Sequence, residues 1–261
     1  MIKKTNVGLM LLLPVLLSSA ACSVKEQRDD CPCRLVLDFT DVDTLAHASV
    51  RVSVSDAAGA VYERSSASGG FCPEFGISVP RCEVDVNVYS GEGDCFDPGK
   101  GIVIPYGEDC PPVFMHSSAV DARCESVRDT VRMHKNHCVV DLYMEKEDDR
   151  EYELCLKGNV SGYGLDGQPV AGDFSFCPSV VRGYAYRACL PRQLDSSLML
   201  EIDDGSEVLK TFALGEYIAA GGYDWDAPDL EDLTVHIDWA MTAVTLTVSG
   251  WDWVYECEIV I

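Results

Sequence analysis

The sequence predicts an all-β protein made of two consecutive antiparallel β-sandwich domains. Apolar side chains recur at every second position along most of the 261 residues, which is the pattern of half-buried strands. Clusters of glycine, aspartate and proline separate these runs, as turns do. The one notable helical pattern lies at 214–220, before Gly221 and Gly222. Because so little helix is available to cover parallel strands, we expect antiparallel sheets that pack face to face.

The N-terminal half contains alternating runs separated by turns at 69–70, 91–93 and 97–99. The polar residues 117–126 follow the apolar pair Val113 and Phe114, and we place the domain boundary there. This gives a first sandwich at 31–122 and a second at 123–261, both of ordinary domain size. The first strands are marked by Leu35, Leu37 and Phe39, by Val50, Val52 and Val54, and by Val84, Val86 and Val88.

The C-terminal half continues the alternation up to the last residue. A first strand is expected from Val131 to Met144, and a turn at 203–205 separates two later strands. The final run, 251–261, places Trp251, Trp253, Tyr255, Cys257, Ile259 and Ile261 on one face. The strands between are marked by Tyr152, Leu154 and Leu156, by Phe174 and Phe176, by Leu198, Leu200 and Ile202, by Val235, Ile237, Trp239 and Met241, and by Val244, Leu246 and Val248.

The charge balance argues against a nucleic-acid partner. The chain has 20 basic and 43 acidic residues and a net charge of −23, so no surplus positive surface faces phosphates. A hydrophobic fraction of 47% fits a folded protein rather than a disordered one. Beyond the N-terminus, no stretch approaches the roughly 20 apolar residues that a transmembrane helix needs.

Residues 1–21 have the pattern of an export signal. Lys3 and Lys4 precede an apolar run at 7–17, and small residues then lead directly to Cys22. This order is typical of a bacterial lipoprotein, whose cysteine is acylated with chains such as palmitate, although Ser19 stands where leucine is usual. Residues 22–30 would then form a lipidated leash that attaches the acidic body to a membrane. Cleavage without a lipid is the alternative.

Thirteen cysteines occur in a chain that leaves the reducing cytoplasm. With Cys22 assigned to the lipid, twelve are left, and this even number favours structural disulfides. Their connectivity does not follow from the sequence, but short loops favour the pairs Cys72 with Cys82 and Cys95 with Cys110. Reduced cysteines that act as small apolar side chains are the alternative.

Patterns that suggest cofactor or metal sites have simpler interpretations. Residues 162–167 match GxGxxG, but no helix follows, so we expect a glycine-rich hairpin loop. His134 and His137 lie on a predicted strand, where an odd offset directs them to opposite faces. The acidic run 224–232 has Asp229 where a calcium loop needs glycine, which favours a solvated acidic loop. Because no nucleophile elbow, HExxH or P-loop occurs, we expect neither a cofactor nor an enzymatic activity.

Several short motifs, taken in order, resemble the FimB/Mfa family of fimbrial anchor lipoproteins from Bacteroides-type bacteria. The resemblance covers essentially the whole mature chain. The motifs are Cys22 with its acidic leash, the residues 33–39 that open the first sandwich, the residues 137–143 that open the second, and the segments 214–218, 235–239 and 250–251.

The resemblance implies two transthyretin-like sandwiches and a non-enzymatic role at the cell surface. The protein would hold the base of a fimbrium on the outer membrane, limit its length and take part in cell adhesion, with fimbrial stalk subunits as partners. Strand addition at an open sheet edge would join the subunits. The candidate strand-exchange segment is 251–261, with an ordinary final core strand as the alternative; its marker residues are Trp251, Trp253, Tyr255, Ile259 and Ile261.

Two other functions are open at this stage. A surface glycan-binding lipoprotein would use exposed aromatic side chains to stack on sugars, namely Tyr184, Tyr186, Trp225 and Trp253. A secreted hydrolase would need a concave pocket in which two carboxylates converge.

Overall fold

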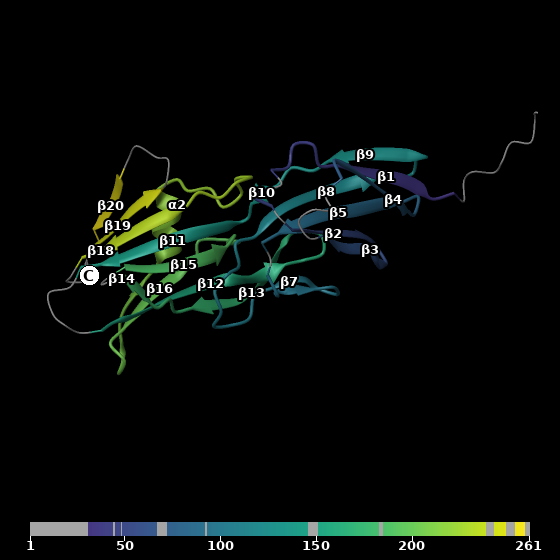
Figure 1. Cartoon of the computed structure of the whole chain (residues 1–261). Coiled ribbons are helices and arrows are strands. Elements are labelled where there is room, and N and C mark those ends of the chain that lie inside the picture. Colours follow the sequence, from purple (N-terminus) through teal and green to yellow (C-terminus); the bar gives the residue numbers. More distant parts are fainter. Residues whose placement is uncertain are drawn as a thin grey trace, which may run out of the picture.

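The protein is an elongated pair of β-sandwiches, which confirms the predicted fold class (Figure 1). The computed structural model describes residues 31–43, 45–47, 49–66, 72–91, 93–145, 151–182, 185–238, 243–248 and 254–258. Among these residues no helix is both long and apolar enough to cross a membrane. The predicted signal at 1–21 and leash at 22–30 lie outside the described residues.

The first sandwich has a three-stranded sheet packed on a five-stranded one. In the smaller sheet, β1 (Cys33–Asp38) lies between β4 (Glu74–Val79) and β9 (Ser126–Thr130). The larger sheet has, in spatial order, β10 (His134–Lys135), β8 (Phe114–Asp121), β5 (Glu83–Ser90), β2 (Val50–Asp56) and β3 (Gly59–Ser66).

The second sandwich has two larger sheets. One contains β14 (Val180–Arg182), β15 (Ala185–Pro191), β11 (His137–Met144), β18 (Leu233–Ile237), β19 (Ala243–Val248) and β20 (Val254–Glu258), in that order. The other contains β17 (Val208–Phe212), β16 (Met199–Asp203), β12 (Glu153–Tyr163), β7 (Gly101–Val103) and β6 (Phe96–Asp97), and β13 (Pro169–Phe176) pairs with β12.

The alternating residues fill the two cores as expected. On β1, Leu35 and Leu37 are fully buried, whereas Val36 between them is only partly buried and Arg34 before them is exposed. Val54 of β2 and Val86 of β5 meet them from the facing sheet, and all belong to one apolar cluster. Burying such side chains is worth about 1.5–3 kcal/mol each. A second cluster fills the other sandwich, with Leu156, Leu200, Val140 and Val235 among its members.

Strand direction differs from the expectation of purely antiparallel sheets at two places. β9 runs parallel to β1, with Ser126 opposite Arg34, and β18 runs parallel to β11, with Leu233 opposite Val140. In both cases the opening strand of the sandwich has an antiparallel neighbour on its other side. The long connections between the parallel partners contain most of the other strands, which allows the chain to return in the same direction.

Strand pairing also differs from the expected division at residue 122. β6 and β7 precede that position, yet β7 pairs with β12 of the second sandwich through Val103 and Gly162. β9 and β10 follow it, yet they belong to the first sandwich through β1 and β8. The expected strand from Val131 to Met144 is accordingly split into β10 and β11. The chain thus crosses between the sandwiches more than once, because polar connections do not reveal where their flanking strands pair.

The predicted helix is present as α2 (Leu214–Ala220). Leu214 and Ile218 are buried in the core of the second sandwich, and Gly222, with φ of 81°, follows the helix end. The helix is too short to cover a sheet, so the sheets must cover each other.

Candidate functional site

The predicted strand-exchange segment is only partly described. Trp251, Trp253, Ile259 and Ile261 lie outside the described residues, as does the predicted lipid site Cys22. Tyr255 lies in β20, where it is paired with Leu246 of β19. Within the described chain, β20 is the outermost strand of its sheet, at the opposite edge from β14.

Two other edge strands of the second sandwich carry exposed apolar side chains. In β14, Val180 and Val181 are 46% and 63% exposed. In β17, Val208 and Leu209 are 50% and 37% exposed. An edge strand leaves backbone N–H and C=O groups open to another chain, and apolar side chains beside them favour such pairing. β14 has three residues and β17 has five, so β17 offers the longer template.

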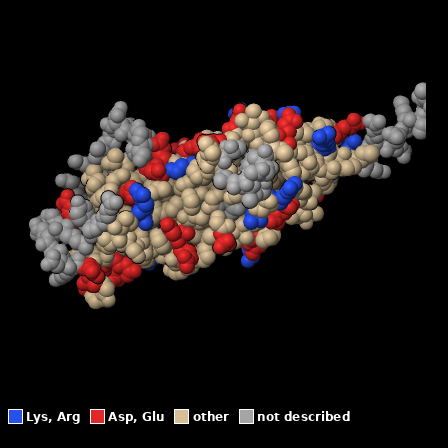
Figure 2. Space-filling view, viewed as in Figure 1, with Lys and Arg blue, Asp and Glu red and all other residues tan. Residues whose placement is uncertain are grey.

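The edge strands β14 and β20 lie at the opposite end of the molecule from β1. β1, the first described strand, lies in the sandwich at one end, and β14, β19 and β20 lie at the other (Figure 1). Acidic side chains are spread along the visible face between these ends, with basic ones among them (Figure 2). A molecule held by its N-terminus would therefore present the edges of the second sandwich outward.

The two sandwiches are joined through an apolar cluster of their own. It contains Tyr89 of β5 and Met115 of β8 from the first sandwich, and Ile102 of β7 and Tyr163 of β12 from the second. Val113, between β7 and β8, completes it, and each of the five side chains is at most 5% exposed. Because these side chains are buried against one another across the junction, the cluster resists bending there.

The glycine-rich motif at 162–167 forms the turn of the β12–β13 hairpin, as predicted, and contacts the first sandwich. The Tyr89 hydroxyl donates to the Gly164 carbonyl at 3.1 Å, and the buried Asn87 side chain donates to the Leu165 carbonyl. Gly167 has φ of +74°, and a Cβ on it would lie 2.0 Å from Ser117 Oγ. The glycine is thus required by a close approach of two sandwiches rather than by a phosphate.

The acidic run 224–232 holds the segment that enters the second sandwich. Asp229 accepts from the Lys135 backbone N–H at 2.7 Å and pairs with His134, and Asp232 accepts from the Val139 N–H at 2.8 Å. Burial alone would raise the pKa of Asp229, but the hydrogen bonds from Lys135 and His134 lower it below its usual value. These carboxylates therefore serve a structural purpose rather than the purely solvated one that was expected.

His134 and His137 are separated by the strand break rather than by opposite faces of one strand. His134 lies in β10 beside Asp229, and His137 lies in β11 with Nδ1 3.0 Å from the Val113 carbonyl. Burial lowers the pKa of His137, so the imidazole is neutral. The two histidines do not share a site.

A cleft of about 530 Å³ opens beside this junction. Arg192 lies at its wall, donating to the Ala227 carbonyl at 2.9 Å and to Asn136 Oδ1 at 3.1 Å. Gln168 and Asp226 line the cleft with exposed side chains. The lining is mixed polar and apolar, without two carboxylates placed as a hydrolytic pair.

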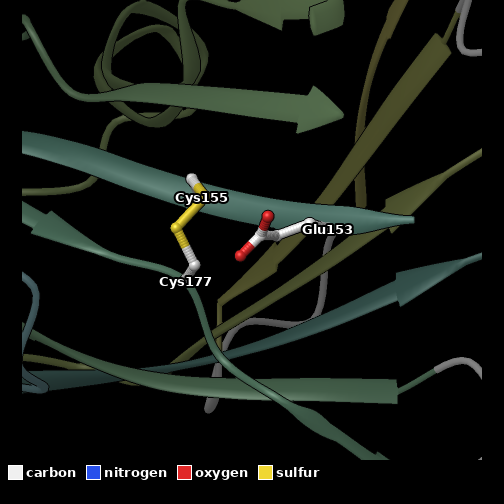
Figure 3. A group of neighbouring side chains, drawn as sticks. All are labelled: Glu153, Cys155 and Cys177. Carbon is white, nitrogen blue, oxygen red and sulfur yellow. A yellow bond between two sulfur atoms is a disulfide. The ribbon is translucent and has the colours of Figure 1, made fainter. Parts of the chain in front are cut away.

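One disulfide is present in the described chain, between Cys155 and Cys177 (Figure 3). Leu156 of β12 pairs with Phe176 of β13, so the preceding and following residues, Cys155 and Cys177, meet across the hairpin. Glu153 lies beside the bond. This pair was not among the predicted disulfides, although two cysteines that flank a predicted hairpin at matching distances from its turn are a signal for it.

The predicted local pairs are not joined in this structure, where Cys72, Cys82, Cys95 and Cys110 are free thiols. Cys72 and Cys82 lie on either side of β4, whose six residues span about 20 Å, far beyond the roughly 4.4–6.8 Å between α carbons that a disulfide requires. Cys110 instead donates its backbone N–H to the Cys189 carbonyl at 3.3 Å.

Of the aromatic side chains expected for sugar stacking, the two that the structure describes are buried. Tyr186 is 2% exposed, and Trp225 is 9% exposed with its ring 4.8 Å from that of Tyr223. Tyr184 and Trp253 lie outside the described residues. Tyr186 and Trp225 contribute to the core of the second sandwich instead.

Solved structures share this fold over most of the chain. A candidate polysaccharide-binding protein from Bacteroides thetaiotaomicron has a TM-score of 0.60 at 14% identity, over 87% of this chain and 98% of its own. The fimbrial anchor protein Mfa2 from Porphyromonas gingivalis has a TM-score of 0.60 at 14% identity, over 85% and 98%. A candidate adhesin from Bacteroides ovatus has a TM-score of 0.55 at 13% identity, over 87% and 95%.

The sequence itself matches no protein-family model and no curated protein. The resemblance to fimbrial anchor proteins that the motifs indicated is confirmed at the level of the fold.

Proposed function

We propose that this chain is a lipid-anchored minor subunit that attaches the base of a fimbrium to the outer membrane and limits its length. The observation that carries the proposal is the two-sandwich fold shared with a fimbrial anchor protein, in a chain whose residues 1–21 have the pattern of an export signal directly before Cys22. The position of the edge strands β14 and β20, at the end of the molecule opposite β1, supports it (Figure 1). The proposed role is mechanical and needs no catalysis.

Anchoring is tested by replacing Cys22 with serine. Because the acyl chains supply the membrane affinity, Cys22→Ser is expected to lose labelled fatty acid, to leave the outer-membrane fraction and to release fimbriae into the medium. Deleting the gene should give longer, detached fimbriae in electron micrographs. Membrane retention of the serine variant, or unchanged fimbriae in the deletion strain, would refute the anchoring role.

We further propose that the first stalk subunit adds a strand to β17 of this chain. β17 combines an open edge with the exposed side chains Val208 and Leu209, and main-chain hydrogen bonds to it would give strength while these side chains set the register. Edge lysines are a common device against such pairing. The test is therefore the double substitution Val208→Lys and Leu209→Lys.

The matched control places the same charges on the other apolar edge, as Val180→Lys and Val181→Lys in β14. Loss of co-purifying stalk subunit only with the β17 variant supports the proposal. Loss only with the β14 variant moves the contact to that edge, and unchanged assembly in both refutes an accepting edge on either strand. Truncation after residue 250 tests the terminal segment, since a folded chain that no longer joins fimbriae would make that segment a donor.

Glycan binding is a second candidate function, favoured by the cleft at the junction. Its exposed Gln168 and Asp226 offer hydrogen-bonding groups, and a protein with the same fold is described as a candidate polysaccharide binder. A glycan array on the purified chain tests it, with Gln168→Ala as the variant. Binding that persists in Gln168→Ala would exclude the cleft.

A further inference from the structure

Cys33 and Cys124 lie together where the chain enters the first sandwich. Cys33 opens β1 and is fully buried, and the exposed Cys124 lies in the connection between β8 and β9. The parallel register sets Arg34 opposite Ser126, and the Arg34 N–H donates to the Glu125 carbonyl at 2.9 Å. Ser126 Oγ in turn donates to the Arg34 carbonyl at 3.1 Å. The backbone around both cysteines is therefore held at a defined separation.

The Cys124 side chain turns back toward the start of β9, where its thiol donates to the Ser126 carbonyl oxygen at 3.2 Å. Burial raises the pKa of Cys33, and the neighbouring Cys124 raises it further.

We propose that Cys33 and Cys124 form a second disulfide, which closes the chain at the point where the N-terminal leash joins the fold. Each cysteine is the immediate neighbour of a residue in the Arg34–Glu125 hydrogen bond, so this bond and the register of β1 and β9 bring the two cysteines close together. The bond is distinct from Cys155–Cys177, which lies in the other sandwich.

Oxidation of the pair needs an acceptor for two electrons, and the proposed acceptor is the disulfide of a thiol oxidoreductase in the export compartment. Cys124 is exposed, so its thiolate attacks that disulfide first and forms a mixed disulfide. The Cys33 thiolate then attacks the Cys124 sulfur and displaces the oxidoreductase. One S–S bond breaks and one forms, and the oxidoreductase leaves as a dithiol that carries the two protons.

The bond has a mechanical consequence that rests on the proposed anchoring role. Tension from a lipid at Cys22 would enter the fold at β1, which is held in its sheet by hydrogen bonds to β4 and β9. A covalent link from Cys33 to Cys124 transfers this tension to a second segment at once, so β1 cannot be pulled out of the sheet alone. The proposed bond itself is inferred from the positions of the two cysteines and does not depend on the anchoring role.

Peptide mapping tests the bond directly. The full chain is purified from the cell envelope without reductant, free thiols are alkylated, and trypsin then releases peptides 29–34 and 124–128, because Arg28, Arg34, Arg123 and Arg128 bound them. We expect these two peptides to be joined and to separate on reduction. Because peptide 29–34 also contains Cys31, the joined pair must persist in Cys31→Ser and disappear in Cys124→Ser.

The Cys155–Cys177 link serves as the internal control for an oxidising environment. Alkylation of both Cys33 and Cys124 in a sample where Cys155–Cys177 is joined would overturn the proposal, and so would a link that is lost in Cys31→Ser. A separate assay compares how much fimbrial material shear removes from cells with the native chain and with Cys124→Ser. Equal shedding with the peptides joined would remove the mechanical role and leave the bond.

Discussion

Removing the Cys155–Cys177 disulfide should destabilise the second sandwich by about 3.4 kcal/mol. The two cysteines are 22 positions apart, so the bond closes a loop of about 23 residues in the unfolded chain, and the loss of loop-closure entropy gives that value at 25 °C. Both side chains are only half-buried, so the double substitution Cys155→Ser and Cys177→Ser leaves little cavity and no unpaired thiol. The loop entropy is therefore the dominant contribution.

Tryptophan fluorescence isolates this effect, because all four tryptophans lie after residue 224 and so report on the second half of the chain. Urea unfolding should show a lower midpoint with an unchanged slope, and thermal unfolding a midpoint lower by about 7–14 °C. The exposed free thiol Cys72 supplies the matched control, since Cys72→Ser should leave both midpoints unchanged. An unchanged midpoint in the double variant, or an equal loss in the control, would refute the loop-entropy argument.

Three further predictions concern the junction between the sandwiches. Gly167→Ala should expose the connection between β10 and β11 to limited proteolysis, because its Cβ would lie 2.0 Å from Ser117 Oγ, whereas Gly205→Ala, which has a similar positive φ but open space, should not. Arg192→Met should lower the free energy of unfolding by roughly 3 kcal/mol in urea titration, because the Ala227 carbonyl and Asn136 lose a charged donor. As the control, Arg187→Met breaks only an exposed pair with Asp141 and should lower the free energy of unfolding by less than about 1 kcal/mol. Burial lowers the pKa of His137 in the folded state, so the neutral imidazole contributes to the free energy of unfolding above the unfolded pKa of about 6.5, and this contribution is lost as the pH falls. His137→Gln should therefore flatten the decline of the free energy of unfolding between pH 7 and pH 5. An unchanged slope would contradict the assignment.

The strands themselves were predictable, because a period of two in the sequence is a local property. Leu35, Leu37 and the valines of β2 and β5 are buried as the alternation indicates, and the helix at 214–220 ends where its glycines begin. The hairpin loop at 162–167 was also recognisable, since no helix follows it. These patterns do not indicate which neighbour each strand pairs with.

The expectations that the structure overturned all depend on which segments pair or pack with each other. β9 joined β1 rather than opening the second sandwich, and β7 joined β12 across the expected boundary. Cys155 is bonded to Cys177 because the register of the β12–β13 hairpin places the two residues opposite each other, whereas an intervening strand holds Cys72 and Cys82 apart. Trp225 is buried because a loop without periodicity folds over the core.

The sequence by itself determined the fold class, most of the strands and the helix, because alternation of apolar side chains along a strand follows from backbone geometry alone. The tertiary structure decided the parallel pairs, the disulfide and the joint between the sandwiches. Contacts between residues far apart in the chain depend on which faces and edges meet in space, and local patterns of hydrophobicity carry no information about that choice.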